Sequence, residues 1–398
     1  MTTFHDTAPT GAARPGFLAR AQLWWGPRIG TQIIVITAVV ALFYVFGANT
    51  VATMDRIGIN PGFDFLGRAA NFEIGETMIP FQAGDTYVRA MLAGLLNTLK
   101  VAFLGCILTT ILGVSVGIAG LSGNMLLAAL VRWYIEIVRN TPTLLQLFFW
   151  VSLAKAFAPP RQSQPLFDAV FLTNRGIFIP GVTLAGGSTL TLILIAALVA
   201  GFFAFVVLAR RRGGLTFSRV LAAVAALIAG IAVSARLTGV EAGLDVPVLS
   251  GFNIRGGMTL SPEFAALLIG LTVKYSAAIA EIVRAGVESV GQGQWEAARA
   301  LGLHRGQIMR LVVVPQALRV ITPLITSSYL DLTKDSSLAV AIGYPDLVAV
   351  INTTANTTGQ AFEALVILIG VFLVINLSVS ALMNIYNERV ALRGNLAR

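Results

Sequence analysis

The chain has 398 residues, of which 56% are hydrophobic and only 12% are charged, and its formal net charge is +9 at pH 7. So few charged side chains cannot cover a soluble protein of this size, and the composition predicts a protein that is solvated by lipid. A positive chain can bind nucleic acid, but no soluble basic domain is present to do so. Membrane topology explains the charge better, so we expect no nucleic-acid partner.

Eight apolar stretches are near or above the length of about 20 residues that is needed to cross a bilayer. Backbone polar groups have no water to bind in lipid, so these stretches are expected to be helices. They cover residues 30–47, 93–119, 139–158, 188–209, 216–236, 262–284, 313–333 and 361–386. The sequence therefore predicts an all-α, polytopic membrane protein with about eight transmembrane helices.

The chain divides into a core, an N-terminal extension and an insertion. The predicted parts are a polar tail over 1–29, an extra helix and extracytoplasmic loop over 30–88, core segments over 89–158 and 262–398, and an insertion over 159–261. Pro159 and Pro160 end the third apolar stretch, and the insertion is expected to contain loops on either side of a helical hairpin. We interpret the basic, apolar start of the chain as a retained helix rather than a cleaved signal peptide.

Local signals mark two helix boundaries. Ser261, Pro262 and Glu263 supply an N-cap, an N1 proline and an acidic first turn, which predict the start of the sixth helix. The run 140–142, Asn-Thr-Pro, enters the third apolar stretch and is interpreted as a kink and packing element.

The arginines are distributed unequally between the loops on the two sides of the membrane. If the N-terminus is cytoplasmic, eight crossings place most arginines on the inner side, as the positive-inside rule requires. This places both termini and the loop over 285–315 in the cytoplasm, and predicts a multi-pass protein of the bacterial inner membrane.

Several chemistries are not predicted. The single cysteine, Cys106, lies in an apolar stretch, so no disulfide or cysteine metal cluster is expected, and His5 and His304 do not predict a metal site. No phosphate-binding loop, zinc-protease motif or nucleophile-elbow motif is present. The sequence therefore predicts neither an enzyme nor a bound cofactor.

The loop over 285–315 is polar and lies between two apolar stretches. Residues 295–301 have helix-forming composition, Gly302 can adopt the left-handed conformation that ends a helix, and a second helix can run from Arg305 to Val313 before Pro315. This pattern predicts a short helix outside the bilayer that docks on another protein. The alternative is an ordinary amphipathic helix lying on the membrane surface.

The spacing Glu-Ala-Ala-x3-Gly-x9-aliphatic-x-aliphatic-Pro resembles the cytoplasmic loop of bacterial ABC importer permeases, with Val312 and Val314 at the aliphatic positions in place of Ile and Leu. In that family the loop docks into a groove on the ATPase subunit. The resemblance therefore implies that the ATPase-docking residues are Trp295, Glu296, Ala297, Ala298, Arg299, Leu301, Gly302 and Pro315.

Three further segments, over 134–149, 280–296 and 315–344, look like the branch of these permeases that carries polar amino acids. The long form of the chain is similar to the larger permease subunit of general L-amino acid, or glutamate/glutamine/aspartate/asparagine, importers. Asp335 and Thr143 depart from the expected asparagine and leucine. The resemblance implies four kinds of partner: ATPase subunits that bind the ATP, a second and different permease, a periplasmic amino-acid-binding protein, and the lipid membrane.

Charges within the predicted membrane helices need a reason, because each costs about 2.5 to 3.5 kcal/mol on insertion scales. Lys274 and Glu281 are seven residues apart and share a helix face, and a polar break follows at Lys334 with Asp331 one turn earlier. Such groups can line a substrate pathway; the alternatives are mutual pairing, snorkelling by Lys274 or a solvated loop. The predicted pathway residues are Lys274, Tyr275, Asp331, Lys334 and Ser336.

Two other classes of function remain open on the sequence. A secondary transporter or channel without an ATPase could use Lys274, Glu281 and Asp331 for ion coupling. A membrane-embedded assembly protein is the other. An ATPase bound through the loop around Glu296 would exclude both.

Overall fold

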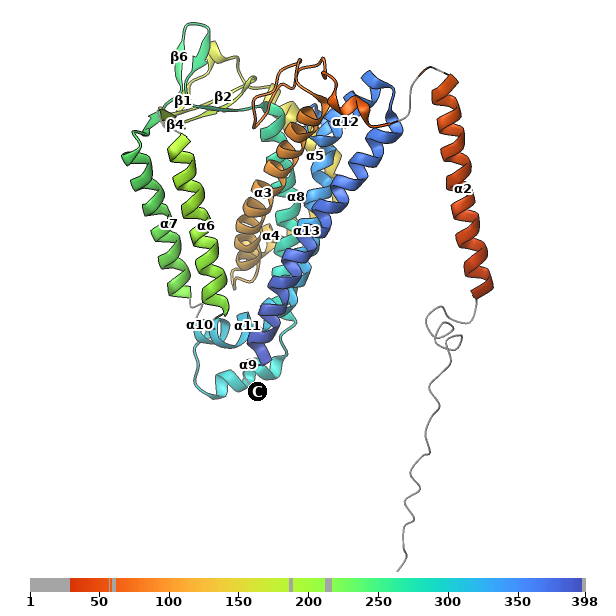
Figure 1. Cartoon of the computed structure of the whole chain (residues 1–398). Coiled ribbons are helices and arrows are strands. Elements are labelled where there is room, and N and C mark those ends of the chain that lie inside the picture. Colours follow the sequence, from red (N-terminus) through yellow and green to blue (C-terminus); the bar gives the residue numbers. More distant parts are fainter. Residues whose placement is uncertain (1–28, 57, 59–61, 186–188, 212–216, 396–398) are drawn as a thin grey trace, which may run out of the picture.

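The computed structural model describes residues 29–56, 58, 62–185, 189–211 and 217–395. The predicted tail over 1–29 therefore lies almost entirely outside the described residues. Helices dominate the described chain, as the sequence predicts (Figure 1). The helices that build the main body are α3 (Tyr87–Gly120), α4 (Met125–Asn140), α5 (Thr143–Lys155), α8 (Pro262–Glu288), α11 (Val314–Asp335), α12 (Leu347–Thr358) and α13 (Ala361–Asn395).

Helix α8 is the centre of this body. It contacts α3, α4, α5 and α11, while α11 packs on α13 and α12 lies against α3 and α13. Leu267 and Leu271 of α8 are fully buried with Val101 of α3, Leu147 of α5 and Leu332 of α11. Apolar helices that meet around one central helix bury their contacts from lipid as well as from water, which places the core along α8.

Within the described part of the chain, five helices are long and apolar enough to cross a membrane: Gly30–Thr53, Tyr87–Gly120, Pro262–Glu288, Arg305–Ile342 and Ala361–Ile385. Three shorter apolar helices cover Thr143–Lys155, Ile193–Val206 and Ala222–Leu237. Each of the eight predicted stretches thus coincides with helix. The all-α, polytopic class is confirmed, and eight crossings are compatible with these helices.

The third stretch, however, is not one helix. Helices α4 and α5 are separated at Thr141, whose backbone is extended with φ −91° and ψ 127°. Proline disfavours helical geometry in the residue before it and lacks an N–H, so Pro142 ends α4 and Thr143 begins a new helix. The predicted kink is therefore a complete break.

The insertion contains the predicted helical hairpin, α6 (Thr189–Arg211) and α7 (Phe217–Leu237). The sequence predicts only loops on either side of this hairpin. In the structure these segments form short antiparallel strands. One sheet has the order β1-β2-β3-β8, and two further ladders pair β4 with β5 and β6 with β7. The bounds are β1 (Pro165–Leu166), β2 (Val170–Thr173), β3 (Gly176–Ile179), β4 (Gly181–Ala185), β5 (Glu241–Asp245), β6 (Val248–Ser250), β7 (Asn253–Arg255) and β8 (Met258–Leu260).

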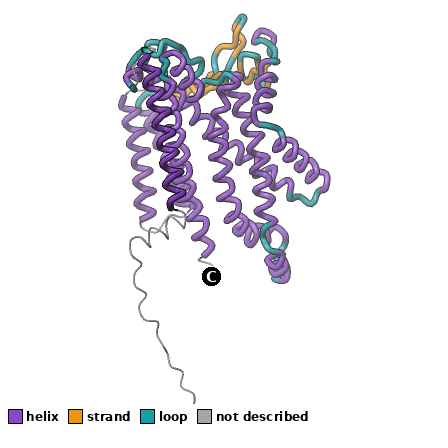
Figure 2. The backbone as a smooth tube through the Cα atoms, turned by 90° about the vertical axis from the view of Figure 1, so that its right-hand side faces the viewer, coloured by secondary structure: helices purple, strands orange, loops and turns teal. Residues whose placement is uncertain are grey.

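The body has two distinct ends. The strands, α12 and the 3-10 helix η1 (Asp64–Gly67) gather at one end, hereafter the sheet end (Figures 1 and 2). Helices α9 (Gln292–Ala300) and α10 (Arg305–Ile308) and the C-terminal part of α13 gather at the other, hereafter the coupling end. The remaining elements are α2 (Ile29–Arg56), η2 (Pro160–Gln162), the π-helix η3 (Met309–Val313) and η4 (Ser336–Ile342).

The start of α8 follows the sequence signals closely. The Ser261 side chain accepts a hydrogen bond from the backbone N–H of Phe264, with Pro262 and Glu263 in the first turn. The predicted N-cap is therefore confirmed, and it fixes where the central helix begins at the sheet end.

Candidate coupling and translocation sites

Helix α9 lies across the coupling end as a short helix of nine residues. It ends at Ala300, and Gly302, two residues later, has a φ of +74°, the left-handed conformation that the sequence predicts there. The next helix, α10, begins with a capping box: Gln307 N–H bonds to the His304 side chain, and His304 N–H bonds to the Gln307 side chain. These caps produce the sharp turn between the two helices.

The second predicted helix, from Arg305 to Val313, is more complex than one α-helix. A turn of α-helix is followed by five residues of π-helix before α11 starts at Val314. Pro315 lies in the first turn of α11, where its missing N–H costs nothing. A π-helical turn inserts extra backbone between the coupling segment and the membrane helix, and such turns are frequent at functional sites.

The two faces of α9 differ. Ala298 is buried with Ile308 and Val313, and Trp295 packs half-buried against the same cluster. Glu296, Ala297 and Arg299 are exposed, as are Gly302 and Pro315, and Leu301 is 79% exposed. Of the predicted docking residues, Trp295 and Ala298 therefore brace the helix from inside, and the others face outward.

A polar contact also ties α9 to the body. The Gln316 amide of α11 donates to the Gln294 side-chain oxygen at 3.2 Å and to the Val312 carbonyl at 3.0 Å. Packing and hydrogen bonding therefore both connect α9 to the first turn of α11.

The predicted pathway residues lie on α8, on α11 and at the start of η4, and they make separate contacts. Tyr275 of α8 donates a hydrogen bond to Asp335 of α11 at 2.8 Å. On the exposed side of α11, Lys334 pairs with Asp331 at 3.6 Å, and both side chains are about 60% exposed, at 59% and 61%. Ser336 is buried and donates to the Thr333 carbonyl, so its hydroxyl is engaged within the backbone.

Lys274 points elsewhere. Its ammonium donates to the carbonyls of Arg139 and Thr141, at 3.2 and 3.3 Å, which are left without helical partners by the break between α4 and α5. Glu281 pairs instead with Arg284, at 2.6 Å, one turn along the same helix. The interpretation that Lys274 and Glu281 pair with each other is therefore wrong: each has a nearer partner.

The sequence did not reveal a polar network at the sheet end. Glu76, from the loop before α3, pairs with Lys100 at 2.6 Å and also accepts a hydrogen bond from the N-cap Ser261. Asn97 donates to the carbonyls of Glu76 and Pro345, at 2.7 and 2.8 Å. A lysine inside the second apolar stretch was the available signal, because such a charge needs a partner.

This network borders a cavity of about 410 Å³ whose lining is mixed, with Glu76, Ser261, Glu263 and Thr353 as polar members beside apolar ones. Asp346 starts α12 nearby by accepting a hydrogen bond from Ala349 N–H at 2.8 Å. Burial raises the pKa of Asp346 to about 7, against the opposing effect of its backbone hydrogen bonds. Among the described residues, no group of three or more histidine, cysteine, aspartate or glutamate side chains is placed to hold a metal ion.

Residues 254–392 match the family model described as "Binding-protein-dependent transport system inner membrane component". The fold and this match define the class of protein: a multi-pass permease of the inner membrane, which is a transport component rather than an enzyme. An ABC importer permease works with ATPase subunits, a second permease and a binding protein.

Relatives of nearly the full length narrow the class. The chain is 46% identical over 367 residues to the "Putative amino-acid ABC transporter permease protein YhdX" of Escherichia coli strain K12, covering 91% of this chain and 93% of that one. It is 41% identical to the general L-amino acid transport system permease protein AapQ of Rhizobium johnstonii, over 91% of each chain. It is 37% identical to the glutamate/glutamine/aspartate/asparagine transport system permease protein BztB of Rhodobacter capsulatus, over 90% of this chain and 94% of that one.

The chain belongs to the family of amino-acid ABC transporter permeases. It is thus the membrane permease of an ATP-driven amino-acid importer. The secondary transporter and the assembly protein, both left open by the sequence, are set aside by this membership.

Proposed function

We propose that this permease binds its ATPase through the outward face of α9. The surface that enters the partner's groove consists of Glu296, Ala297, Arg299 and Leu301. The observation that carries this is the division of α9 into a braced inner face and an exposed outer face at the coupling end. Gly302 and the π-helical turn after it set the angle of the helix relative to α11.

Two substitutions test the docking. Glu296→Lys reverses the charge of the outer face, and Gly302→Asp places a side chain at a residue with φ +74°, where L residues are strained. Both variants are expected to insert normally but to hydrolyse ATP without transport, measured as ATPase activity and uptake in proteoliposomes. Gly239→Asp is the matched control, because its φ is +71° and it also has open space, but it lies at the sheet end.

In the Gly239→Asp control, ATP hydrolysis should remain coupled to transport. Normal uptake by Glu296→Lys, together with normal ATPase binding, would exclude α9 as the docking element.

We further propose that the coupling end is cytoplasmic and the sheet end extracytoplasmic, with both termini inside. The arginine distribution supports this orientation. In a Cys106→Ala background, a cysteine at Gly302 should react with an impermeant thiol reagent only from the cytoplasm, and one at Gly251 only from outside. Reaction at Gly302 from outside would reverse the topology.

The predicted domain division, with an insertion over 159–261 between core segments 89–158 and 262–398, is part of this proposal. Strand pairing supports it: β3 pairs with β8 and β4 with β5, so the two ends of the insertion return to the same place beside the core.

The amino-acid pathway is proposed to run along the face of α11 that carries Asp331 and Lys334, beside the Tyr275–Asp335 contact. Exposed charges at membrane depth are costly in lipid, so this face is expected to meet water or the second permease, a chain different from this one. The substrates are proposed to be L-amino acids, either polar and acidic or of broad range, delivered by an extracytoplasmic binding protein.

Lysine substitutions test the pathway. Lys334→Met should reduce glutamate uptake more than uptake of a neutral amino acid, because it removes a partner for a second carboxylate. Lys274→Met should reduce both equally, because Lys274 holds the break between α4 and α5. If both variants transport both substrates normally, the pathway lies elsewhere.

A further inference from the structure

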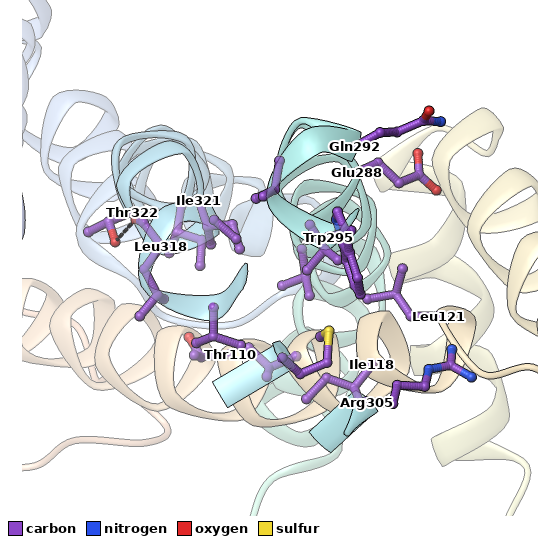
Figure 3. A pocket seen from close by; sticks show the side chains of 18 of the residues that line it. Thr110, Ile118, Leu121, Glu288, Gln292, Trp295, Arg305, Leu318, Ile321 and Thr322 are labelled. Atoms are coloured by element: carbon purple, nitrogen blue, oxygen red, sulfur yellow. Dashed lines mark hydrogen bonds between the residues drawn. The ribbon is translucent and has the colours of Figure 1, made fainter. Parts of the chain in front are cut away.

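A cavity of about 930 Å³ lies at the coupling end. Its walls come from α3, α8, α9, α10, η3 and α11, with Met383 of α13 closing one side. Figure 3 shows the side chains that line it, with Trp295 of α9 in the middle of the wall. The cavity is therefore shared by the coupling helix and the membrane helices.

One end of the cavity offers almost no free polar group. The hydroxyl of Thr110 is bonded to the Tyr329 hydroxyl and to the Cys106 carbonyl, each at 2.6 Å. Thr322 donates to the Leu318 carbonyl at 2.6 Å. These threonines are satisfied within the protein, so this end presents mainly methyl and methylene groups to an occupant.

The other end is polar. Glu288 and Gln292 lie near each other, and Arg305 lies apart from them beyond Trp295 and Leu121, all on the side of the cavity away from Thr110 and Thr322 (Figure 3). The Glu288 carboxylate is paired with Arg284 at 2.6 Å. Arg305 is exposed and forms no ion pair within the part of the chain that the structure describes.

The depth of the cavity matches one leaflet of a bilayer. Along α3 it extends from Thr110 to Leu121, and 11 residues at about 1.5 Å each give roughly 16 Å. Half of a hydrocarbon core of about 30 Å is close to this length. The apolar end suits an acyl chain better than an amino acid, because the two charges of an amino acid would be desolvated there without a partner.

We propose that this cavity binds a phospholipid from the membrane leaflet at the coupling end. An acyl chain of the lipid packs between α3 and α11, and its phosphate is held by Arg305. Charge complementarity selects the headgroup, because Arg305 is the cationic side chain among those lining the cavity and guanidinium binds phosphate through paired hydrogen bonds. Since Trp295 forms part of the wall, the bound lipid braces α9 against the membrane helices.

The test measures phospholipid retained by the complete importer. The assembled complex is purified in mild detergent, and bound lipid is counted by native mass spectrometry before and after exchange with phosphatidylglycerol. Ile118→Trp fills the cavity and is expected to lower retained lipid on the order of tenfold. Ile111→Trp is the matched control, because Ile111 and Ile118 lie on α3 with 62% and 61% exposure but only Ile118 lines the cavity.

A second pair isolates the phosphate contact. Arg305→Gln should weaken phosphatidylglycerol retention on the order of tenfold, since it removes a charge-assisted contact. Arg310→Gln, an exposed arginine five residues along that does not line the cavity, should not.

Three results would overturn the proposal: a wild-type importer with no retained phospholipid, equal retention by Ile118→Trp and Ile111→Trp, or a disulfide between a cysteine at Ile118 and the second permease. The last would mean that a protein segment fills the cavity.

Discussion

The interface between α3 and α8 and the hairpin of α6 and α7 are both pairs of apolar helices, yet they are held together differently. On α3, a Cβ built at Gly113 would lie 2.7 Å from Ile279 Cβ, and one at Gly117 would lie 2.8 Å from Val283 Cβ. In the hairpin, a Cβ at Gly201 meets no atom within 4 Å, and one at Gly230 would lie 3.1 Å from Leu198 Cδ2, the end of a flexible side chain. Small residues let helices approach closely in lipid, where apolar burial alone gives no preference for a partner.

The hairpin is also anchored at the sheet end. Strands β4 and β5 pair over five positions, from Gly181 with Asp245 to Ala185 with Glu241, so the backbone ladder holds the bases of α6 and α7 together. The comparison shows two ways to position a membrane helix. Contact of glycine with backbone and branched side chains fixes the core helices, whereas the hairpin combines looser side-chain contact with hydrogen bonds at the sheet end.

The largest effect is expected from adding side chains at the two kinds of glycine. Gly113→Val should destabilise the core by about 1–3 kcal/mol or more, because the Ser276 carbonyl, 2.9 Å from the new Cβ, is backbone and cannot move aside easily. Gly201→Val should have little effect. Thermal unfolding in detergent measures both, and equal losses would show that the hairpin is packed as tightly as the core.

Removing the hairpin should have a smaller effect. Joining Ala185 to Glu241 through Asn-Gly replaces residues 186–240 with a two-residue turn that suits these directly paired strands. The shortened permease is expected to remain monodisperse on size exclusion with a modest loss of melting temperature, since α8 makes its main contacts within the core. If this shortened variant aggregates while the Gly201→Val control stays folded, the hairpin is required for the stability of the core.

Sequence reasoning was most accurate where one local rule decides the structure. Ser261, Pro262 and Glu263 marked the start of α8, and Gly302 was required by the turn after α9. Hydropathy likewise located every long apolar helix, because lipid imposes a length and leaves helix as the available structure.

Sequence reasoning was least accurate where contacts with residues distant in the sequence determine the structure. Helix α12 ends in a run rich in threonine and asparagine, which are weak helix formers, and it is stabilised by Asp346 and by packing on α3 and α13. Two ends of the insertion meet to form the β3–β8 and β4–β5 pairs, a relationship that local patterns do not contain. Lys274 also has partners more than 130 residues away.

The last effect concerns a buried carboxylate at the start of α12, and its size depends on pH. Asp346 is 1% exposed, one of its carboxylate oxygens has no hydrogen-bond partner, and burial raises its pKa from the ordinary 3.8 to about 7. A raised pKa means that the folded state binds more protons, so this contribution to stability is complete below about pH 4 and is lost as the pH rises through about 7.

Asp346→Asn separates the cap from the charge, because asparagine caps a helix about as well as aspartate and does not ionise. The variant should unfold at a higher temperature than the wild type near pH 8, and this advantage should shrink steadily towards about pH 5. Asp64→Asn, which removes an exposed carboxylate at the same end, controls for net charge. If the wild-type and Asp346→Asn melting curves stay parallel across this range, Asp346 does not titrate on folding, and the core tolerates its charge as well as the exposed loops do.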